Sequence, residues 1–110
     1  MGWRDKMWKN IKCNKIAGIE KLVGEYNIWE LYKTPYGKFK IKIYVDSSGR
    51  YRGYTNLQVL DEVGDFCCGV GGGNTEEMAL EDTLNNFLEM LSRKEVWEEE
   101  DFQCSDSYDF

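Results

Sequence analysis

The segment from residue 38 to residue 45 alternates polar and apolar residues without a break, and this pattern constrains the fold more than any other. Its apolar positions are Phe39, Ile41, Ile43 and Val45, and its polar positions are Lys38, Lys40, Lys42 and Tyr44. Side chains on a strand alternate between two faces. Period two therefore predicts a β-strand with one buried face and one lysine-rich face.

Turn signals on both sides place this strand in an antiparallel sheet. A preceding strand is expected over 26–33, and a turn at 34–37 with the single proline follows it. The Asp-Ser-Ser-Gly turn at 46–49 predicts a third strand from residue 50 to about residue 60. A short fourth strand is expected over 66–70.

The outer face of this predicted sheet mixes basic and aromatic side chains. If Tyr51, Leu57 and Val59 face the core, the intervening positions of their strand lie on the lysine side. Basic and aromatic groups together can hold a phosphate backbone and stack on bases. The candidate nucleic-acid face consists of Lys38, Lys40, Lys42, Tyr44, Arg50, Arg52 and Tyr54. An ordinary solvated face is the favoured alternative, because a sequence pI of about 4.7 opposes polyanion binding.

The strongest predicted helix follows the glycine run at 71–73. Asn74 is expected as its N-cap, with Glu77 closing a capping box. Glu76 and Glu77 lie in the first turn, where they would repel a phosphate, so a tight strand-to-helix connection is expected and not a phosphate loop. The apolar face of this helix consists of Leu80, Leu84, Phe87, Leu88 and Leu91.

Residues 3–23 place apolar residues at helical spacing among lysines and predict one or two N-terminal helical segments. The predicted fold class is therefore α+β, with an N-terminal helix, a three- to four-stranded antiparallel sheet and one long helix packed on one sheet face. Residues 1–94 are expected to form a single α+β domain, and residues 95–110 an acidic, aromatic C-terminal tail.

Composition argues against several classes of function. The 110-residue chain has no histidine, which removes the commonest general base and most zinc chemistry, so no enzymatic activity is expected. The four cysteines form no C-x-x-C pair, so free thiols are expected, with no metal or other cofactor. Short apolar runs and an N-terminus charged from the start predict a cytoplasmic protein with no membrane partner.

Charge is divided unevenly along the chain. Residues 1–55 carry 12 Lys or Arg and 5 Asp or Glu, a balance of +7, whereas residues 56–110 carry 2 and 15, a balance of −13. Such asymmetry indicates electrostatic partners and says little about the fold. The acidic half of the chain is able to bind a basic groove of a partner. The basic half is able to bind nucleic acid or to pack against the acidic half.

The segment 95–110 carries seven acidic residues, no basic residue and four aromatic residues. A solvated end is the ordinary interpretation of such a charged block. Alternating acidic and aromatic side chains can also imitate phosphate and base, and aromatic residues anchor interfaces. The candidate partner-binding residues are Glu95, Trp97, Glu98, Glu99, Glu100, Asp101 and Phe102.

Residues 45–51 (VDSSGRY) and 73–80 (GNTEEMAL) resemble the HicB-type antitoxin family. Its toxin-neutralising domain carries a D-x-x-G-x-Y hairpin and a G-x-T-x-E-E-A-L helix start on a β-β-β-α unit. The resemblance covers about residues 38–92, with Met78 at the usual second Glu, and lacks the family's Pro-Gly-Cys element and C-terminal DNA-binding segment. It implies an antitoxin or immunity protein that neutralises a small toxin.

The helix start also resembles the double-stranded RNA-binding domain, an α-β-β-β-α fold with G-x-G-x-S-K-K-x-A at its last helix. Gly71, Gly73, Thr75 and Ala79 keep that spacing. Glu76 and Glu77 replace the lysines that bind phosphate, so the resemblance implies the topology and argues against that family's RNA binding.

The profile of the whole chain is similar to that of small acidic phage anti-defence proteins, including anti-CRISPR proteins. This resemblance implies a non-enzymatic inhibitor that occupies the basic nucleic-acid-binding groove of a larger protein, such as a CRISPR effector nuclease, by carboxylate mimicry in the host cytoplasm. The alternatives are the HicB-like antitoxin and a nucleic-acid-binding module that uses the lysine face. A monomer or homodimer is expected.

Overall fold

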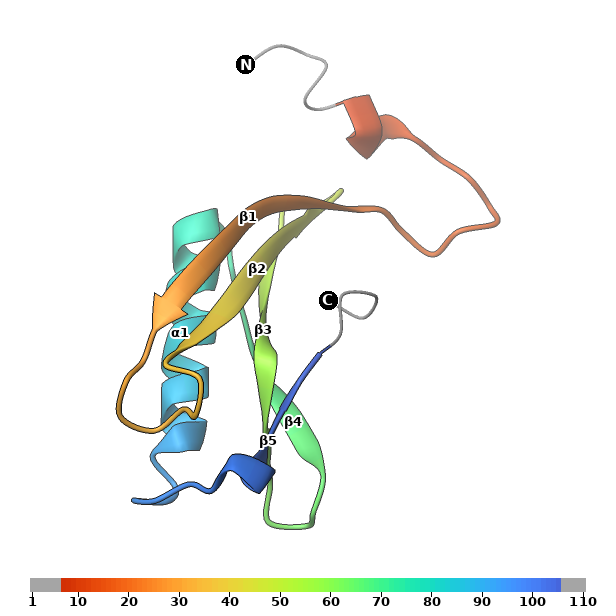
Figure 1. The fold of residues 1–110 in the computed structure, drawn as a ribbon. Coiled ribbons are helices and arrows are strands. Elements are labelled where there is room, and N and C mark those ends of the chain that lie inside the picture. Colours follow the sequence, from red (N-terminus) through yellow and green to blue (C-terminus); the bar gives the residue numbers. More distant parts are fainter. Residues whose placement is uncertain (1–6, 106–110) are drawn as a thin grey trace.

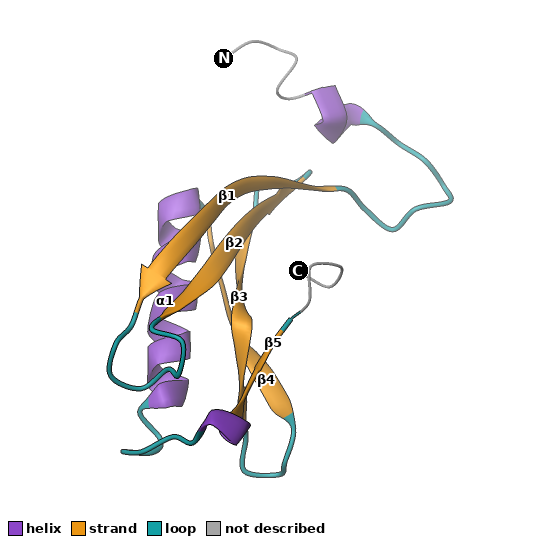
Figure 2. Cartoon of the chain, in the orientation of Figure 1, coloured by secondary structure: helices purple, strands orange, loops and turns teal. Residues whose placement is uncertain are grey.

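The sheet of the computed structural model is antiparallel, and its first four strands are neighbours in chain order (Figures 1 and 2). The structure describes residues 7–105. The strands are β1 (Glu20–Trp29), β2 (Lys38–Asp46), β3 (Tyr51–Leu60) and β4 (Phe66–Gly73). The α+β class and the strand that the alternation predicts are confirmed.

The second and third hairpin connections are built in the same way. Asp46 and Asp61 each begin a D-x-x-G turn, and Gly49 and Gly64 adopt positive φ angles of 89° and 92°. The Asp46 carboxylate accepts hydrogen bonds from the Ser48 hydroxyl and from two backbone amides downstream. The Asp61 carboxylate accepts two equivalent amide bonds. A side chain that replaces backbone partners in this way favours a tight turn.

The long helix, α1 (Glu76–Leu91), packs on one face of the sheet over β4, β3 and β2 (Figure 1). Glycines make this approach close. A Cβ at Gly69 would lie 2.6 Å from Cβ of Phe87, and a Cβ at Gly71 would overlap the backbone of Thr83. The glycine run therefore belongs to β4 itself, which ends at Gly73 and not at residue 70.

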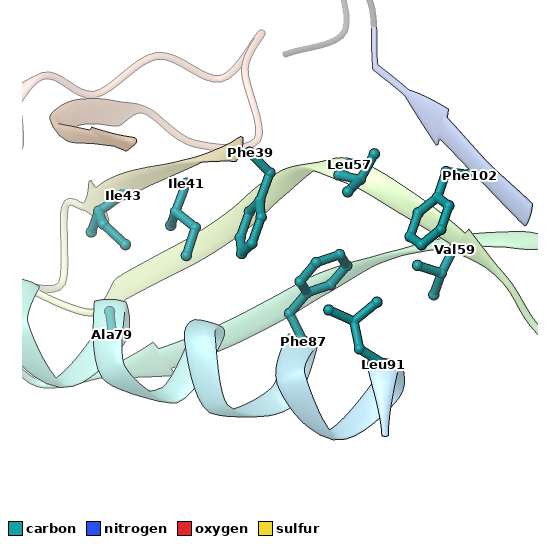
Figure 3. Packing of buried hydrophobic residues seen from close by; sticks show 9 residues of the cluster. All are labelled: Phe39, Ile41, Ile43, Leu57, Val59, Ala79, Phe87, Leu91 and Phe102. Atoms are coloured by element: carbon teal, nitrogen blue, oxygen red, sulfur yellow. The ribbon is translucent and has the colours of Figure 1, made fainter. Parts of the chain in front are cut away.

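The core lies between this helix and the sheet (Figure 3). The rings of Phe39 on β2 and Phe87 on α1 are 4.8 Å apart at their centroids. Fully burying a side chain of this kind contributes about 1.5–3 kcal/mol. The members of the cluster are Phe39, Ile41, Ile43, Leu57, Val59, Ala79, Phe87, Leu91 and Phe102.

The buried stripe of α1 differs from the predicted apolar face. Ala79, Thr83 and Phe87 are fully buried at four-residue spacing, whereas Leu88 is 41% exposed. Phe87 and Leu91 of the predicted face are buried as expected. Small residues face the sheet at Ala79 and Thr83, where the glycines of β3 and β4 bring the helix too close for a larger side chain. The predicted N-cap is also wrong by one residue, since Thr75 Oγ1, and not Asn74, accepts the bond from the Met78 amide at 3.1 Å.

The predicted N-terminal helix is wrong over most of its described length. Residues 7–10 form one short 3-10 helix, η2 (Met7–Asn10), residues 11–19 have no regular structure, and β1 begins at Glu20. The predicted helix over residues 3–6 lies outside the described residues. From Glu20 onward, β-strand pairing with β2 outweighs the local helical pattern.

The first strand is also earlier than its expected range of 26–33. Beyond Trp29 the chain turns, because the Glu30 carboxylate accepts backbone amide bonds from Tyr32, Lys33 and Thr34. Within residues 7–105, every helix is too short or too polar to span a membrane.

Candidate functional site

The chain continues after α1 into a fifth strand, β5 (Phe102–Cys104), which pairs antiparallel with residues 57–59 of β3. A strand has two edges, and β4 already occupies one edge of β3 at Gln58. β5 therefore pairs with the other edge of β3, which β2 no longer occupies beyond Thr55. The Ser105 amide extends the pairing with a 2.8 Å bond to the Asn56 carbonyl. The described part of the predicted tail is thus built into the fold.

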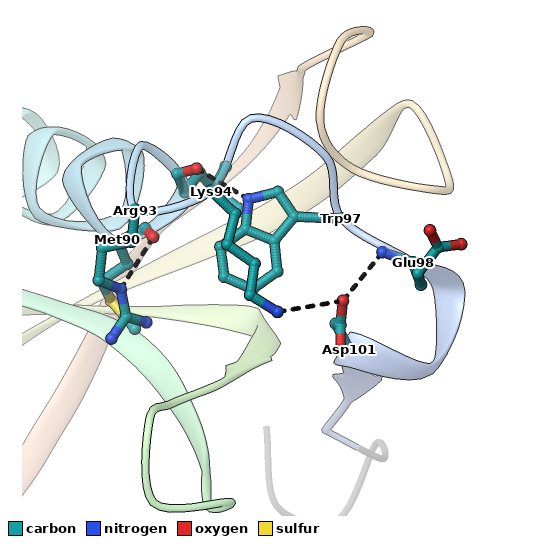
Figure 4. Close-up of polar contacts among 7 residues, drawn as sticks. Met90, Arg93, Lys94, Trp97, Glu98 and Asp101 are labelled. Atoms are coloured by element: carbon teal, nitrogen blue, oxygen red, sulfur yellow. Dashed lines mark hydrogen bonds and ion pairs between the residues drawn. The ribbon is translucent and has the colours of Figure 1, made fainter.

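Trp97 (Figure 4) and Phe102 (Figure 3), predicted as partner anchors, pack within the protein. Phe102 is 7% exposed and belongs to the core. Trp97 is partly buried against it, with ring centroids 5.7 Å apart. The Trp97 indole N–H donates to the Leu91 carbonyl at 2.8 Å, which satisfies an acceptor that the end of α1 leaves open. Lys94 Nζ lies 4.8 Å from the centroid of the Trp97 ring.

Asp101 also has an internal role. It closes the short helix η3 (Glu99–Asp101), where its carboxylate accepts the Glu98 amide at 2.9 Å. The same carboxylate lies 3.7 Å from Lys94 Nζ, and its side chain is 16% exposed. Figure 4 shows both contacts. The structure therefore separates the predicted site into internal residues, Trp97, Asp101 and Phe102, and four exposed glutamates, Glu95, Glu98, Glu99 and Glu100.

The segment that carries the exposed glutamates meets the start of the β3–β4 turn, a neighbour that its sequence does not indicate. Asp61 and Glu62 of that turn line one shallow pocket with Arg93, Lys94 and Trp97. Figure 1 places the turn and η3 at the same end of the molecule. We call this region the acidic end: Asp61, Glu62, Asp65, Glu95, Glu98, Glu99 and Glu100. The acidic composition of residues 61–65 is the signal that could have indicated it.

Within the acidic end, hydrogen bonds favour the ionised form of the Asp61 carboxyl group. The Asp65 amide and the Cys67 thiol donate to its carboxylate and hold its pKa below the ordinary value. The same contact raises the pKa of the Cys67 thiol, and burial raises that of Cys68. Both thiols are therefore protonated at neutral pH, which makes them poor nucleophiles.

The predicted nucleic-acid face is the side of the sheet opposite α1. Lys38, Lys40, Lys42 and Tyr44 of β2 and Arg52 and Tyr54 of β3 share it by strand alternation and register. The rings of Tyr44 and Tyr54 are 6.0 Å apart at their centroids, edge to face. Arg50 differs from the others because it lies in the turn before β3, where its amide bonds to Asp46.

Strand β1 adds two residues to this face that the sequence analysis missed. Trp29 lies opposite Lys38, whose Nζ is 5.2 Å from the centroid of the indole ring. Glu25 Oε1 lies 3.8 Å from Lys40 Nζ. Trp29 lies within the predicted strand 26–33, but its face follows only from the pairing of β1 with β2. We call the set Trp29, Lys38, Lys40, Lys42, Tyr44, Arg52 and Tyr54 the open face.

Between residues 7 and 105, no group of three or more His, Cys, Asp or Glu side chains is arranged to hold a metal ion. Comparison with known proteins gives no match to a family model, to a curated protein or to a solved structure. The candidate site therefore rests on two charged surfaces, the acidic end and the open face.

Proposed function

We propose that this protein is a non-enzymatic inhibitor that occupies a basic nucleic-acid-binding groove of a larger protein through its acidic end. The class of partner is a nucleic-acid-processing enzyme, with a CRISPR effector nuclease as the first candidate. One observation carries the proposal: Glu95, Glu98, Glu99 and Glu100 stand exposed on a segment that β5, Trp97 and Asp101 hold in place.

Ordered carboxylates suit this role for two reasons. A segment that is already fixed loses less conformational entropy on binding than a free tail. Carboxylate oxygens also accept the charge-assisted bonds that arginine and lysine otherwise give to phosphate. The acidic β3–β4 turn adds Glu62 and Asp65 to the same field, which accelerates encounter with a basic groove.

Trp97 and Phe102 act in this proposal as positioning residues. The core contacts of Phe102 and the bond from Trp97 to Leu91 place η3 and its glutamates. Their substitution is therefore expected to weaken inhibition by releasing the acidic segment from its place.

The test measures DNA cleavage by a panel of purified CRISPR effector nucleases with increasing amounts of the protein. The variant E98Q/E99Q/E100Q removes three exposed charges of the acidic end. The matched control E77Q/E81Q/E89Q removes three charges from the exposed side of α1. Inhibition of one nuclease by the wild type and the control, with at least tenfold weaker inhibition by the first variant, supports the proposal.

Two results would contradict it. Equal inhibition by both variants would exclude the acidic end as the binding element. Absence of inhibition across the panel, together with capture of a small basic toxin by both variants, would favour the antitoxin alternative.

A further inference from the structure

The open face is a second surface of the protein, and its chemistry differs from that of the acidic end. We propose that it binds single-stranded nucleic acid, with the lysines of β2 along the phosphate backbone and the aromatic side chains stacked on bases. This inference does not depend on the proposed function, because it concerns different residues and a ligand of opposite charge.

The first argument is the geometry of the cations. Lys38, Lys40 and Lys42 occupy successive same-face positions of β2, which lie about 6.8 Å apart on a strand. Arg52 on the neighbouring strand faces Tyr44 in the register. The three lysines therefore form a basic row along β2, and Arg52 adds a positive charge on the neighbouring strand β3. Such a row is complementary to a polyanion that lies along the strand.

The second argument is the placement of the aromatic side chains. Trp29 is 71% exposed beside Lys38, and Tyr54 lies opposite Lys42. Exposed aromatic rings beside cations are the elements that bind single strands without sequence preference, because every base offers a flat face.

The third argument concerns the acidic composition of the chain. The net charge of −6 opposes polyanion binding only if the acids share the open face. Many of them lie on α1 or at the acidic end, and Arg52 stands eight residues before Leu60, where the acidic turn begins. Eight residues of strand span about 26 Å, so the Arg52 end of the face lies beyond the Debye length of about 8 Å at physiological salt. The row of lysines runs from this end toward the acidic end, because β2 and β3 are antiparallel and Ile41 pairs with Thr55. Glu25 is an acid on the face and pairs with Lys40, and the carboxylates of Glu20 and Asp46 interact electrostatically with Arg52.

The experiment measures fluorescence anisotropy of a fluorescein-labelled 20-nucleotide poly(dT) with the full chain, from 50 to 300 mM salt. The variant K38Q/K40Q/K42Q removes the three positive charges of the lysine row. The matched control K9Q/K12Q/K15Q removes the same charge from the segment before β1. We expect the salt slope of log K to fall in magnitude by about 2 in the first variant, because each lost phosphate contact contributes about 0.7.

A second pair of variants tests stacking. Trp29→Ala is expected to weaken binding about tenfold, whereas Tyr32→Ala, at a 93% exposed ring in the β1–β2 loop, is expected to leave it unchanged. Circular dichroism verifies that every variant is folded.

Three results would overturn the inference: no binding at 50 mM salt, an equal loss in both triple-lysine variants, or equal displacement of poly(dT) by polyglutamate of the same charge. The last result would mean that an acidic polypeptide, including the acidic end of a second copy, fits the open face as well as nucleic acid does.

Discussion

The two faces of the same sheet differ in how their residues are used. On the face under α1, β2 presents apolar side chains and β4 presents glycines, and the helix is so close that a methyl group at Gly71 would overlap its backbone. On the open face, lysines and aromatic rings occupy the same strands at the intervening positions. Because side chains alternate along a strand, the residues that stabilise the fold lie on one face of the sheet. The other face is left for interactions with partners. Substitutions on the covered face are therefore expected to change stability, and substitutions on the open face to change binding.

The largest effect is expected from Phe87→Ala. Phe87 is fully buried and packs against the tilted ring of Phe39, so its removal leaves a cavity and costs about 3–5 kcal/mol of unfolding free energy. Its neighbour Leu88 is 41% exposed, and Leu88→Ala is the matched control with an effect below about 1 kcal/mol. Urea unfolding at neutral pH measures both. Equal costs would mean that the helix packs through a different stripe.

A smaller effect is expected from Gly71→Ala, because its Cβ meets the backbone of Thr83, which no rotamer change relieves. Overpacking of this kind costs about 1–3 kcal/mol. At Gly72, on the other face of β4, the nearest atom to an added Cβ is the Tyr51 carbonyl oxygen at 3.2 Å, and Gly72→Ala is expected to cost less. Thermal unfolding followed by circular dichroism compares the two. A reversed order would mean that the close approach of α1 is not the reason for the glycine run.

Trp97→Phe tests the attachment of the acidic segment to the covered face. The change keeps the aromatic ring and removes the N–H that donates to Leu91, so a loss of about 1 kcal/mol is expected. Hydrogen exchange at β5 amides is expected to accelerate before that of β3. Unchanged exchange at Phe102 and Gln103 would show that β5 is held without Trp97.

The two D-x-x-G turns join the strands that form both faces, and their aspartates make the stability of the fold depend on pH. Hydrogen bonds from Ser48 and Arg50 lower the pKa of Asp46, and bonds from Asp65 and Cys67 lower that of Asp61. A carboxylate whose pKa is lower in the folded state stabilises the fold above its unfolded pKa of about 3.8, and this contribution is lost as pH falls through the folded value.

Asp46→Asn and Asp61→Asn are therefore expected to reduce stability at pH 6 and to flatten its decline below pH 4. Glu62→Gln is the control, because it removes a carboxylate from the same turn and leaves the bonds to Asp61 in place. Denaturant midpoints measured from pH 2.5 to pH 7 test this, and a parallel acid decline in the Asp and Asn forms would contradict it.

The smallest effect on stability is expected on the open face. Trp29→Ala removes a mostly exposed ring and is expected to change the unfolding free energy by less than about 0.5 kcal/mol, although it weakens oligonucleotide binding. Chemical denaturation beside the anisotropy measurement tests the contrast. A loss of several kcal/mol would mean that the open face is a second core.

Prediction from sequence was correct where one local pattern of side chains determines the structure. It was wrong where two kinds of secondary structure compete for the same residues. The alternation of β2 was enough to assign Phe39 and Ile41 to the core and Lys40 to the other face. Residues 20–23 satisfied a helical pattern equally well, and only pairing with β2 decided for a strand. Trp97 and Phe102 were interpreted as interface anchors because nothing in the local sequence shows that β3 has a free edge at residues 57–59.

The sequence by itself determined the strand order of the hairpins, the positions of their D-x-x-G turns, the long helix after the glycines and the two-sided character of β2. These features depend on residues close together in the chain, through side-chain period, turn chemistry and capping. Only the tertiary structure decided which stripe of α1 is buried, where the acidic segment attaches and which acids share an end. Those outcomes depend on contacts between distant residues, such as Gly71 with Thr83 and Phe102 with Val59, and no local pattern encodes the distance between them.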